Sequence, residues 1–350
     1  MTRPRAICLI SGGLDSMLAA KVVAEQGVDV EGVNFFTGFC VEGHTQAIRS
    51  SQSDKVKRHG ALWVAEQIGI KIHIEDIVED YKDVVLNPKH GYGKLLNPCL
   101  DCKIFMVNRA MEMKSSDGYP YDFVVTGEVI GQRPKSQRSN TMSIVAKESG
   151  VEDRLLRPLC AKHLPPTLPE RKGWVNRDEL FDFSGRTRKP QFELARKFGI
   201  TEWSQPAGGC CFLTDESYSN RLNDLWQSRK VRDYEFEDIV LLKVGRHIRP
   251  TEEFKVIIAR DEGESNYLQG FKKQFKTIQL VSHTGPVSLF DGIASESNLH
   301  LASQIIARYS KGRNADNVLV SITDESGVSR DLTIEPLPAH EIEQNWHIGI

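Results

Sequence analysis

Two groups of residues in this chain have types and spacing suited to chemistry, and the first is SGGLDS, Ser11 to Ser16, directly after the apolar run Ala6 to Ile10. A strand that ends in such a turn before a helix exposes backbone N–H groups that suit a phosphate. Glycine has no Cβ, so a pyrophosphate can approach the main chain closely. Asp15 would repel that phosphate unless Mg²⁺ lies between them or the carboxylate caps the helix. The pattern predicts a metal-bound nucleotide held by Ser11, Gly12, Gly13, Asp15 and Ser16, against the alternative of an ordinary strand-to-helix turn.

The second group consists of cysteines. Cys99 and Cys102 form a CxxC in NPCLDCK, which is expected to open a helix and to place the first sulfur near the positive end of its dipole. Cys210 and Cys211 follow Gly208-Gly209, whose backbone N–H groups could stabilise a sulfur anion. Because adjacent side chains diverge in an extended segment, only one of this pair is expected to join the CxxC.

Three interpretations of these cysteines stay open. Cys99, Cys102 and Cys210, with Cys211 as the alternative third ligand, could hold a [4Fe–4S] cluster with one iron open to an exogenous sulfide. Alternatively, Cys210 or Cys211 could carry a persulfide that Cys102 resolves. The third interpretation is that they are buried apolar cysteines.

The elements around these residues alternate between strand and helix. Strands are expected at 6–10, 28–36, 71–75 and 123–126, and helices at 15–26, 55–68 and 99–115. This succession predicts an α/β fold, a doubly wound parallel sheet that binds its ligands at the carboxyl ends of its strands. Both SGGLDS and Thr126-Gly127-Glu128 follow such strands, so they are expected to face one crevice.

The composition changes after these alternating elements. The high proline content of residues 155–206 predicts a covering loop or linker. A helix is expected after it, at 217–228. A smaller α+β domain is expected after it, with strands at 239–244, 254–259, 277–281, 318–322 and 332–334 and a helix at 299–309. The predicted segments are 1–155 for the nucleotide domain, 156–229 for a basic, cysteine-containing segment that completes the site, and 230–350 for the second domain.

The chain-wide composition limits the class of protein. Its 350 residues carry a net charge of −2, which alone argues against nucleic-acid binding, but residues 133–197 hold 15 Lys/Arg against 8 Asp/Glu. Such a local excess suits a polyphosphate partner. Seven cysteines, an odd number, argue against a disulfide framework, and no apolar run approaches a membrane span. We expect a cytoplasmic protein that does not enter a membrane.

Taken together, these motifs resemble those of known enzymes. SGGLDS resembles the PP-loop of N-type ATP pyrophosphatases, which split ATP to AMP and pyrophosphate while adenylating a substrate. TGEVIGQRPKSQ, residues 126–137, is similar to a signature of tRNA 4-thiouridine synthetases, and NPCLDCK and GGCCF resemble segments of tRNA 2-thiouridylases. LKVGRH, residues 242–247, and IARD, residues 258–261, resemble more weakly the NFACT-R RNA-binding domain.

The resemblance implies ATP-dependent thiolation of a tRNA uridine. It implies adenylation of the uracil carbonyl, with Gly127 and Gln132 positioning the nucleotide or the base, and then sulfur transfer. Its main version is 4-thiouridine formation with sulfide on a [4Fe–4S] cluster. The alternatives are a 2-thiouridylase that uses a persulfide donor and a PP-loop enzyme that acts on a small molecule. The implied cofactors are ATP, Mg²⁺ and the cluster, and the implied partner is tRNA, with a homodimer left open.

An RNA-binding surface is expected on the basic segment. Its phosphate contacts are expected from Arg133, Lys135, Arg138, Arg157, Lys162, Arg171, Lys172, Arg186, Arg188 and Lys189, extended by Arg246 and His247.

Overall fold

A computed structural model describes residues 3–41, 60–133, 136–201, 203 and 210–349. These residues form two compact units, of which the first ends at Thr214 and the second begins at Asp215. The segment boundaries expected from the sequence, near residues 155 and 229, stay predictions. Within the described residues, no helix is both long enough and apolar enough to cross a membrane.

The first unit is built on a five-stranded sheet in which every neighbouring pair is parallel. Its strand order is β3-β2-β1-β4-β5. The predicted strands appear within one to two residues, at β1 (Arg5–Leu9), β2 (Asp29–Phe36), β3 (Lys71–Asp76) and β4 (Phe123–Val125), and β5 (Leu155–Leu156) completes the edge. The doubly wound α/β fold is therefore confirmed for this unit.

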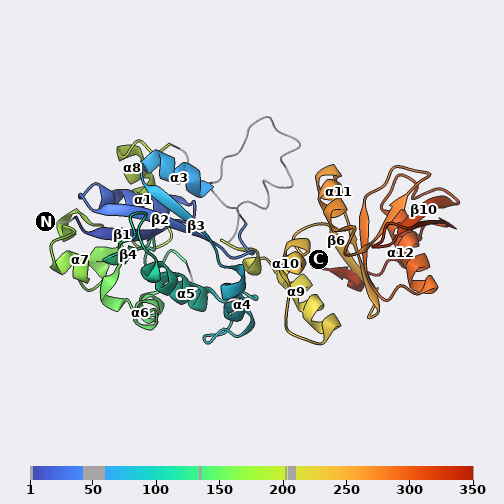
Figure 1. Cartoon of the computed structure of the whole chain (residues 1–350), viewed down its shortest axis with the longest axis horizontal. Coiled ribbons are helices and arrows are strands. Elements are labelled where there is room, and N and C mark those ends of the chain that lie inside the picture. Colours follow the sequence, from blue (N-terminus) through green and yellow to red (C-terminus); the bar gives the residue numbers. More distant parts are fainter. Residues whose placement is uncertain (1–2, 42–59, 134–135, 202, 204–209, 350) are drawn as a thin grey trace. The chain divides into compact units, whose positions relative to one another are not determined.

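Helices cover both faces of the sheet. Figure 1 shows α1, α3 and α8 on one face and α5 and α6 on the other. The helices of this unit are α1 (Leu14–Ala24), α3 (Gly60–Ile68), α4 (Val78–Leu86), α5 (Cys99–Glu112), α6 (Ser139–Glu148), α7 (Leu168–Arg171) and α8 (Lys189–Lys197). Helices α4, α6, α7 and α8 were not expected from the sequence, and the last two lie within residues 155–206, which were expected to form a covering loop or linker.

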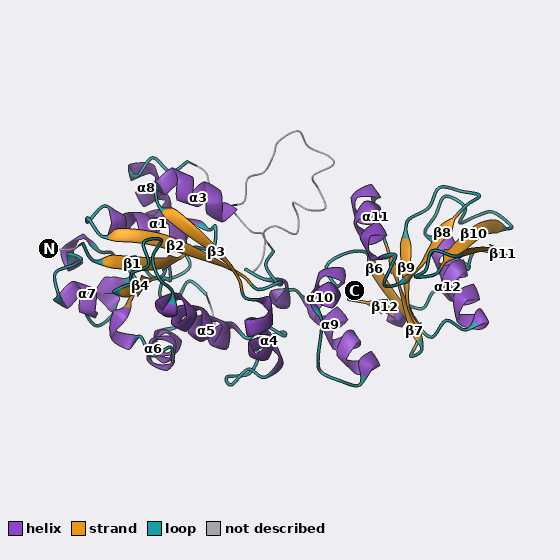
Figure 2. Cartoon of the chain, viewed as in Figure 1, coloured by secondary structure: helices purple, strands orange, loops and turns teal. Residues whose placement is uncertain are grey.

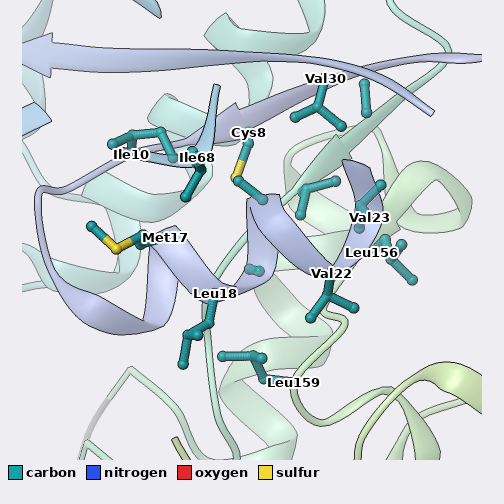
Figure 3. Close-up of a cluster of buried hydrophobic side chains, with 14 of the residues drawn as sticks. Cys8, Ile10, Met17, Leu18, Val22, Val23, Val30, Ile68, Leu156 and Leu159 are labelled. Atoms are coloured by element: carbon teal, nitrogen blue, oxygen red, sulfur yellow. The ribbon is translucent and has the colours of Figure 1, made fainter. Parts of the chain in front are cut away.

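The core of this unit surrounds α1. Its side chains Met17, Leu18 and Val23 are fully buried against Cys8 of β1 and Leu156 of β5 (Figure 3). Burial of such side chains stabilises the fold by about 1.5–3 kcal/mol each. A helix buried on nearly every side cannot shift easily, so the loop that precedes it is held in place.

The strand order reverses at β1. Strands β1, β2 and β3 follow one another in one direction across the sheet, and the chain then returns to place β4 on the other side of β1. In open α/β sheets this switch point is where the carboxyl ends of two strands leave room for a ligand. SGGLDS follows β1 and Thr126-Gly127-Glu128 follows β4, so both motifs lie at the switch point.

The second unit contains a seven-stranded antiparallel sheet with its own core. Figure 2 shows its strands in orange with the helices of this unit in purple. Its order is β11-β10-β8-β9-β7-β6-β12. Leu299, Ile305 and Ile306 of α12 pack against this sheet. The strands are β6 (Arg246–Thr251), β7 (Phe254–Ile258), β8 (Lys276–Leu280), β9 (Ser288–Gly292), β10 (Val318–Thr323), β11 (Ser329–Ile334) and β12 (His347–Ile348), and the helices are α9 (Glu216–Arg229), α10 (Phe236–Leu241), α11 (Glu262–Leu268) and α12 (Glu296–Arg308). The predicted smaller α+β architecture is confirmed.

One predicted element of this unit is wrong. Residues 239–244 were expected to form a strand, but residues 239–241 belong to helix α10 and residues 242–244 follow its end. The Asp238 carboxylate accepts the backbone N–H of Glu235 at 2.8 Å and pairs with Arg229 at 2.6 Å, which fixes a helix start. A short apolar run does not distinguish strand from buried helix, and here the cap decides it.

Candidate active site

The nucleotide loop links the end of β1 to the start of α1. Gly12 has φ +76°, a left-handed conformation that favours glycine, and Gly13 is the N-cap residue of the helix. The Ser16 hydroxyl donates to the carbonyl oxygen of Gly13 at 2.8 Å and accepts the backbone N–H of Ser11 at 3.3 Å. The two hydroxyls, of Ser11 and Ser16, lie 3.4 Å apart. The loop is thus closed on itself around the helix N-terminus, the arrangement that a phosphate site requires.

Asp15 lies in the first turn of α1, but it makes no side-chain cap there. Its Oδ2 accepts a hydrogen bond from Gln132 Nε2 at 2.6 Å. The same oxygen forms an ion pair with Arg188 at 3.3 Å. Its Oδ1 is buried and has no hydrogen-bond partner among the described residues. Carboxylate oxygens are the ligands that Mg²⁺ prefers, so this unpartnered oxygen fits the predicted metal site.

Gly127 lies against the first turn of that helix. A Cβ on this residue would meet the carbonyl carbon of Asp15 at 2.4 Å and the backbone nitrogen of Ser16 at 2.5 Å. The segment after β4 can therefore approach the nucleotide loop only with glycine at this position. Gln132, five residues further on, is held in turn by Gln191, whose Nε2 donates to Gln132 Oε1 at 3.0 Å.

Glu128 forms a buried ion-pair network next to this glycine. Lys103 pairs with one carboxylate oxygen, and Arg157 Nε donates to the other at 2.9 Å. Burial opposes ionisation, but the two cations outweigh it and hold the pKa of Glu128 at about 2. The predicted role of Arg157 as an RNA phosphate contact is wrong, because this side chain is 5% exposed and bound to Glu128 and to the carbonyl oxygen of Met142.

The CxxC lies in the first turn of α5, as expected. Asn97 Nδ2 donates to Cys99 Sγ at 3.0 Å, which orients the first thiol. Burial raises the pKa of Cys99, and it raises that of Cys102 to about 12 with a further contribution from the negative charge of Cys210. The expected thiolate at the helix N-terminus is therefore wrong, because desolvation outweighs the helix dipole.

Cys210 is the thiolate of the group. The Cys211 thiol donates a hydrogen bond to Cys210, and together with Arg133 and Lys103 it lowers the pKa of Cys210 to about 5. The same hydrogen bond raises the pKa of Cys211 well above its ordinary value. The Cys210 side chain is exposed, whereas Cys211 is half-buried. An exposed, ionised sulfur beside two cations is the environment of a reactive cysteine.

The sequence did not indicate Tyr81, and it left the role of Cys40 undecided. The hydroxyl of Tyr81, in α4, hydrogen-bonds with the Cys102 thiol. Cys40 lies opposite Cys211 in an antiparallel bridge, and its thiol is 3.5 Å from Thr37 Oγ1. Neither residue belongs to a motif. Only the position of Tyr81 after β3 and that of Cys40 after the carboxyl end of β2 could have indicated them.

The nucleotide and cysteine groups are joined by two short links. Gln132 donates to Asp15, and the next residue, Arg133, donates to the Cys210 sulfur. Lys103 pairs with Glu128 and also lowers the pKa of Cys210. The two groups predicted from separate motifs therefore form one site.

The predicted [4Fe–4S] cluster is not supported by this arrangement. In the described part of the chain, no three His, Cys, Asp or Glu side chains are grouped so that they could hold a metal ion. Cys210 instead accepts a hydrogen bond from the Cys211 thiol, and its negative charge contributes to the raised pKa of Cys99 and of Cys102.

Two of the side chains predicted to contact RNA, Arg188 and His247, have other partners in the structure. Arg188 lies at Asp15 in the nucleotide site, and His247 is 2% exposed with its Nε2 bound to two carbonyl oxygens, so the predicted contact of His247 with RNA is wrong. Lys135, Gly208 and Gly209 lie outside the described residues. Arg246 is half-buried, and its contact with RNA stays a prediction. The other side chains are exposed, and their contacts with RNA stay predictions: Arg133, Arg138, Lys162, Arg171, Lys172, Arg186 and Lys189.

Comparison with known families divides the chain in the same way. Residues 4–151 match the family model described as the tRNA methyl transferase HUP domain. Residues 245–347 match the model described as the NFACT protein RNA binding domain.

Curated relatives of the first unit carry the name tRNA-specific 2-thiouridylase MnmA. The protein of Malacoplasma penetrans is 24% identical over 234 residues, 63% of this chain and 59% of that protein. The protein of Geotalea uraniireducens is 27% identical over 226 residues, 62% of this chain and 56% of that protein. The chain thus spans less than two thirds of the length of either relative.

Among solved structures, a 4-thiouridine synthetase in complex with RNA and ATP is 18% identical, over 56% of this chain and 52% of that one. The TM-score of 0.33 is too low for this likeness to bear on function.

Proposed function

Because this chain joins a PP-loop domain of the kind found in tRNA-modifying enzymes to an NFACT-R RNA-binding domain, we propose that it is an ATP-dependent tRNA sulfurtransferase. In this proposal it adenylates a uracil carbonyl oxygen, releases pyrophosphate and then replaces the oxygen with sulfur. The observation that carries the proposal is the contact of two adjacent residues with the two groups: Gln132 with Asp15 and Arg133 with Cys210.

The nucleotide loop would activate the uridine. The backbone of Gly12 and Gly13 and the hydroxyls of Ser11 and Ser16 suit the pyrophosphate of ATP, and Arg188 adds a cation beside them. Asp15 would hold Mg²⁺ through its unpartnered Oδ1, and the ion would offset the charge that develops on the departing pyrophosphate. Transfer of AMP to the carbonyl oxygen turns a poor leaving group into a good one.

The cysteines would supply the sulfur. Cys210, ionised at neutral pH, takes a sulfane sulfur from a persulfide-bearing donor protein, which leaves as its thiol. The terminal sulfur of the new persulfide attacks the adenylated carbon, so a C–S bond forms, the C–O bond to AMP breaks and AMP departs. The tRNA is then joined to Cys210 through a disulfide bond.

Cys102 would release the product. Its sulfur attacks Cys210 Sγ, a Cys102–Cys210 disulfide forms, and its proton passes to the thiouracil that leaves. One cause of the raised pKa of Cys102, the negative charge of Cys210, is absent once Cys210 is in a persulfide or disulfide. A cellular dithiol must reduce the disulfide before the next turnover.

The comparisons favour a reaction in which a persulfide supplies the sulfur and the 2-position of uridine receives it. Among the described residues, no three His, Cys, Asp or Glu side chains are grouped so that they could hold a cluster, and the matched relatives are named 2-thiouridylases. We therefore propose 2-thiouridine as the product in place of 4-thiouridine, and the cytoplasm as the place of reaction.

The test combines a strain and a purified protein. Mass spectrometry of tRNA nucleosides from a strain that lacks this protein should show loss of a 2-thiouridine. In vitro, Cys210→Ser should still release pyrophosphate when tRNA and ATP are added but form no thiouridine, whereas Asp15→Ala should release none. Cys160→Ser is the control, because Cys160 is buried and serine keeps a donor to the carbonyl oxygen of Glu128.

Each other outcome points elsewhere. Pyrophosphate release that tRNA does not stimulate would favour a small-molecule substrate. Loss of 4-thiouridine from the strain would refute the 2-position. Thiouridine formation by Cys210→Ser would refute the persulfide on Cys210. Absorbance near 400 nm in anaerobically prepared protein, lost in Cys99→Ala, would instead support the [4Fe–4S] cluster.

A further inference from the structure

A cavity of about 1200 Å³ lies in the second unit, and none of its lining residues belongs to the candidate active site. It is lined by the beginning of β6, by the residues between β7 and α11 with the start of α11, by residues 284–286, by the end of α12 with the segment that follows it, and by Ala339, Ile342 and His347. This volume exceeds the roughly 300–1000 Å³ of typical ligand pockets, so the cavity is large enough for a small ligand.

The charge of the cavity is opposite to that of its surroundings. Residues 215–350 carry 16 Lys/Arg and 21 Asp/Glu, so this part of the chain is acidic. The cavity lining, however, includes five Lys/Arg and only two acidic residues, Asp261 and Glu262. Asp261 is engaged as the N-cap of α11, where its carboxylate accepts the backbone N–H of Glu264 at 2.9 Å. Cations gathered in a hollow of an acidic domain mark a site for an anion.

Most of these cations are not neutralised by the protein. Arg260 pairs with the buried Glu264. Arg308, in contrast, donates only to the carbonyl oxygen of Arg313 at 3.2 Å. Neither Lys311 nor Arg313 forms an ion pair within the described residues, and both side chains are exposed. Three positive charges, on Arg308 at the end of α12 and on Lys311 and Arg313 after it, therefore remain available to phosphates.

An aromatic side chain lies among them. Tyr309 is half-buried in the cavity wall, with the Arg246 guanidinium 5.4 Å from its ring centre. Its hydroxyl lies 3.4 Å from His347 Nε2, and His347 Nδ1 has no partner in the described part of the chain. Burial and Arg246 lower the pKa of His347, so the imidazole is neutral at pH 7 and can exchange hydrogen bonds with an uncharged group.

We propose that this cavity binds an unpaired nucleotide of the tRNA substrate, with its base stacked on Tyr309 and its flanking phosphates on Lys311 and Arg313. The inference rests on the proposed function for the identity of the RNA. An aromatic ring beside an arginine and a row of free cations is the chemistry that holds single-stranded RNA. A base paired in a duplex would not present its face to a ring inside a hollow.

Fluorescence anisotropy with the full chain and an unmodified tRNA transcript tests the proposal. The double variant Lys311→Glu/Arg313→Glu should bind at least about tenfold more weakly, and the slope of log affinity against log salt should fall by about two, one for each phosphate contact. Tyr309→Ala should lose about tenfold, whereas Tyr309→Phe should stay close to the wild type because it keeps the ring. Thermal unfolding curves establish that each variant is folded.

The matched control reverses two charges elsewhere in the same unit. Lys272 and Lys273 are exposed and do not line the cavity, so Lys272→Glu/Lys273→Glu makes the same change in net charge. Its affinity should stay within about threefold of the wild type. Equal losses in both double variants would overturn the proposal, because they would show attraction by net charge alone.

Competition identifies the form of the ligand. A single-stranded RNA of 12 nucleotides should displace the tRNA, and a blunt duplex of the same length should not. Displacement by the duplex, or by AMP and not by the single strand, would overturn the assignment to an unpaired nucleotide of RNA.

The failure of this inference differs from the failure of the proposed function. A wild-type protein that binds tRNA through the cavity but never forms thiouridine would refute the sulfurtransferase and leave the cavity site standing. A wild-type protein that forms thiouridine, with Lys311→Glu/Arg313→Glu equal to it in affinity and rate, would refute the cavity site alone.

Discussion

Cys210 owes its ionisation to its neighbours. The hydrogen bond from Cys211 is the largest favourable contribution, and Arg133 and Lys103 follow, so the pKa is about 5. We expect alkylation of Cys210 by iodoacetamide to reach half its maximal rate near pH 5 and to be constant above pH 6, because only the thiolate reacts. The measurement is peptide mass spectrometry of samples quenched between pH 4 and pH 9.

Two variants separate the contributions of Cys211 and Arg133 to the low pKa of Cys210. Cys211→Ala removes the thiol donor and should move the midpoint toward the ordinary value of about 8.5, and Arg133→Gln should move it less. A wild-type midpoint near pH 8 would contradict this account of the site.

Glu128 links pH to stability. Its folded-state pKa of about 2 lies below the ordinary 4.5, so the ionised carboxylate stabilises the fold above pH 4.5 and the effect is lost as the pH falls toward 2. Glu128→Gln should lower the free energy of unfolding by about 3 kcal/mol at pH 7. Urea unfolding at pH 7 and pH 4 measures both values. A difference between wild type and variant that did not shrink at pH 4 would show that Glu128 acts through shape and not through charge.

Cys40 is expected to cross-link to Cys211. The backbone N–H of Phe212 bonds the carbonyl oxygen of Phe39 at 2.8 Å, which makes the next pair, Cys40 and Cys211, a closely spaced non-hydrogen-bonded pair. The Cβ atoms of such pairs lie about 4.5–5.5 Å apart, close to the separation in a disulfide.

Diamide oxidation should therefore give a Cys40–Cys211 disulfide, identified in a peptide map. Because the Cys211 thiol is then consumed, Cys210 loses its donor and its alkylation at pH 6 should slow at least tenfold. Cys40→Ser should show neither change. Oxidation that links Cys211 only to Cys102 would contradict the expectation.

For single residues, the sequence was informative where the residue type allows only a few roles. Asp15 beside a phosphate loop has few roles, and its carboxylate lies next to Gln132, whereas its contact with Mg²⁺ stays a prediction. Tyr81 and Cys40 could not be found, since their contacts depend on how α4 and β2 meet segments far away in the chain. The expected thiolate of the CxxC was wrong because sequence shows the helix dipole and not the burial that opposes it.

Among the elements, the segment after β4 depends on its closeness to α1. Gly127→Ala would place a methyl group 2.4–2.5 Å from the backbone of Asp15 and Ser16, so either element must move. We expect a loss of stability of about 1–3 kcal/mol and weaker ATP binding, measured by thermal unfolding and isothermal titration. Gly270→Ala is the control, because a Cβ there meets nothing within 4 Å. Normal ATP affinity in Gly127→Ala would show that the contact does not shape the site.

Elements were predictable where local and long-range preferences agree. The apolar run before SGGLDS could only be a buried strand, and β1 lies in the middle of the sheet. In contrast, the run at 239–244 fits a strand or a helix equally, and a buried Asp238 paired with Arg229 selected the helix. Such pairs are not visible in a single sequence.

For the whole molecule, each unit has a core of its own. The second unit buries Phe254, Val320 and Ile306 among others, and α9 begins at Glu216 with Asp215 as its cap. We therefore expect residues 215–350 to fold when expressed alone and to unfold in one cooperative transition, seen by calorimetry and by well-dispersed amide signals in NMR. A fragment without a cooperative transition would show that its core is incomplete.

At this scale the sequence indicated the α/β and α+β architectures, since the spacing of apolar runs differs between the two halves. It could not indicate the cavity, because its cations come from four separate elements and no local run of charge reveals them. The homodimer stays a prediction.

The bridge between Cys40 and Cys211 also has a consequence for protein engineering. It fastens the residues after Cys210 to the end of β2, independently of the chain that leads to them. The length of the chain at residues 204–209 is then not what determines where the reactive sulfur lies. Insertions at these positions are expected to leave the register of Cys211 unchanged, so a peptide tag can be grafted there.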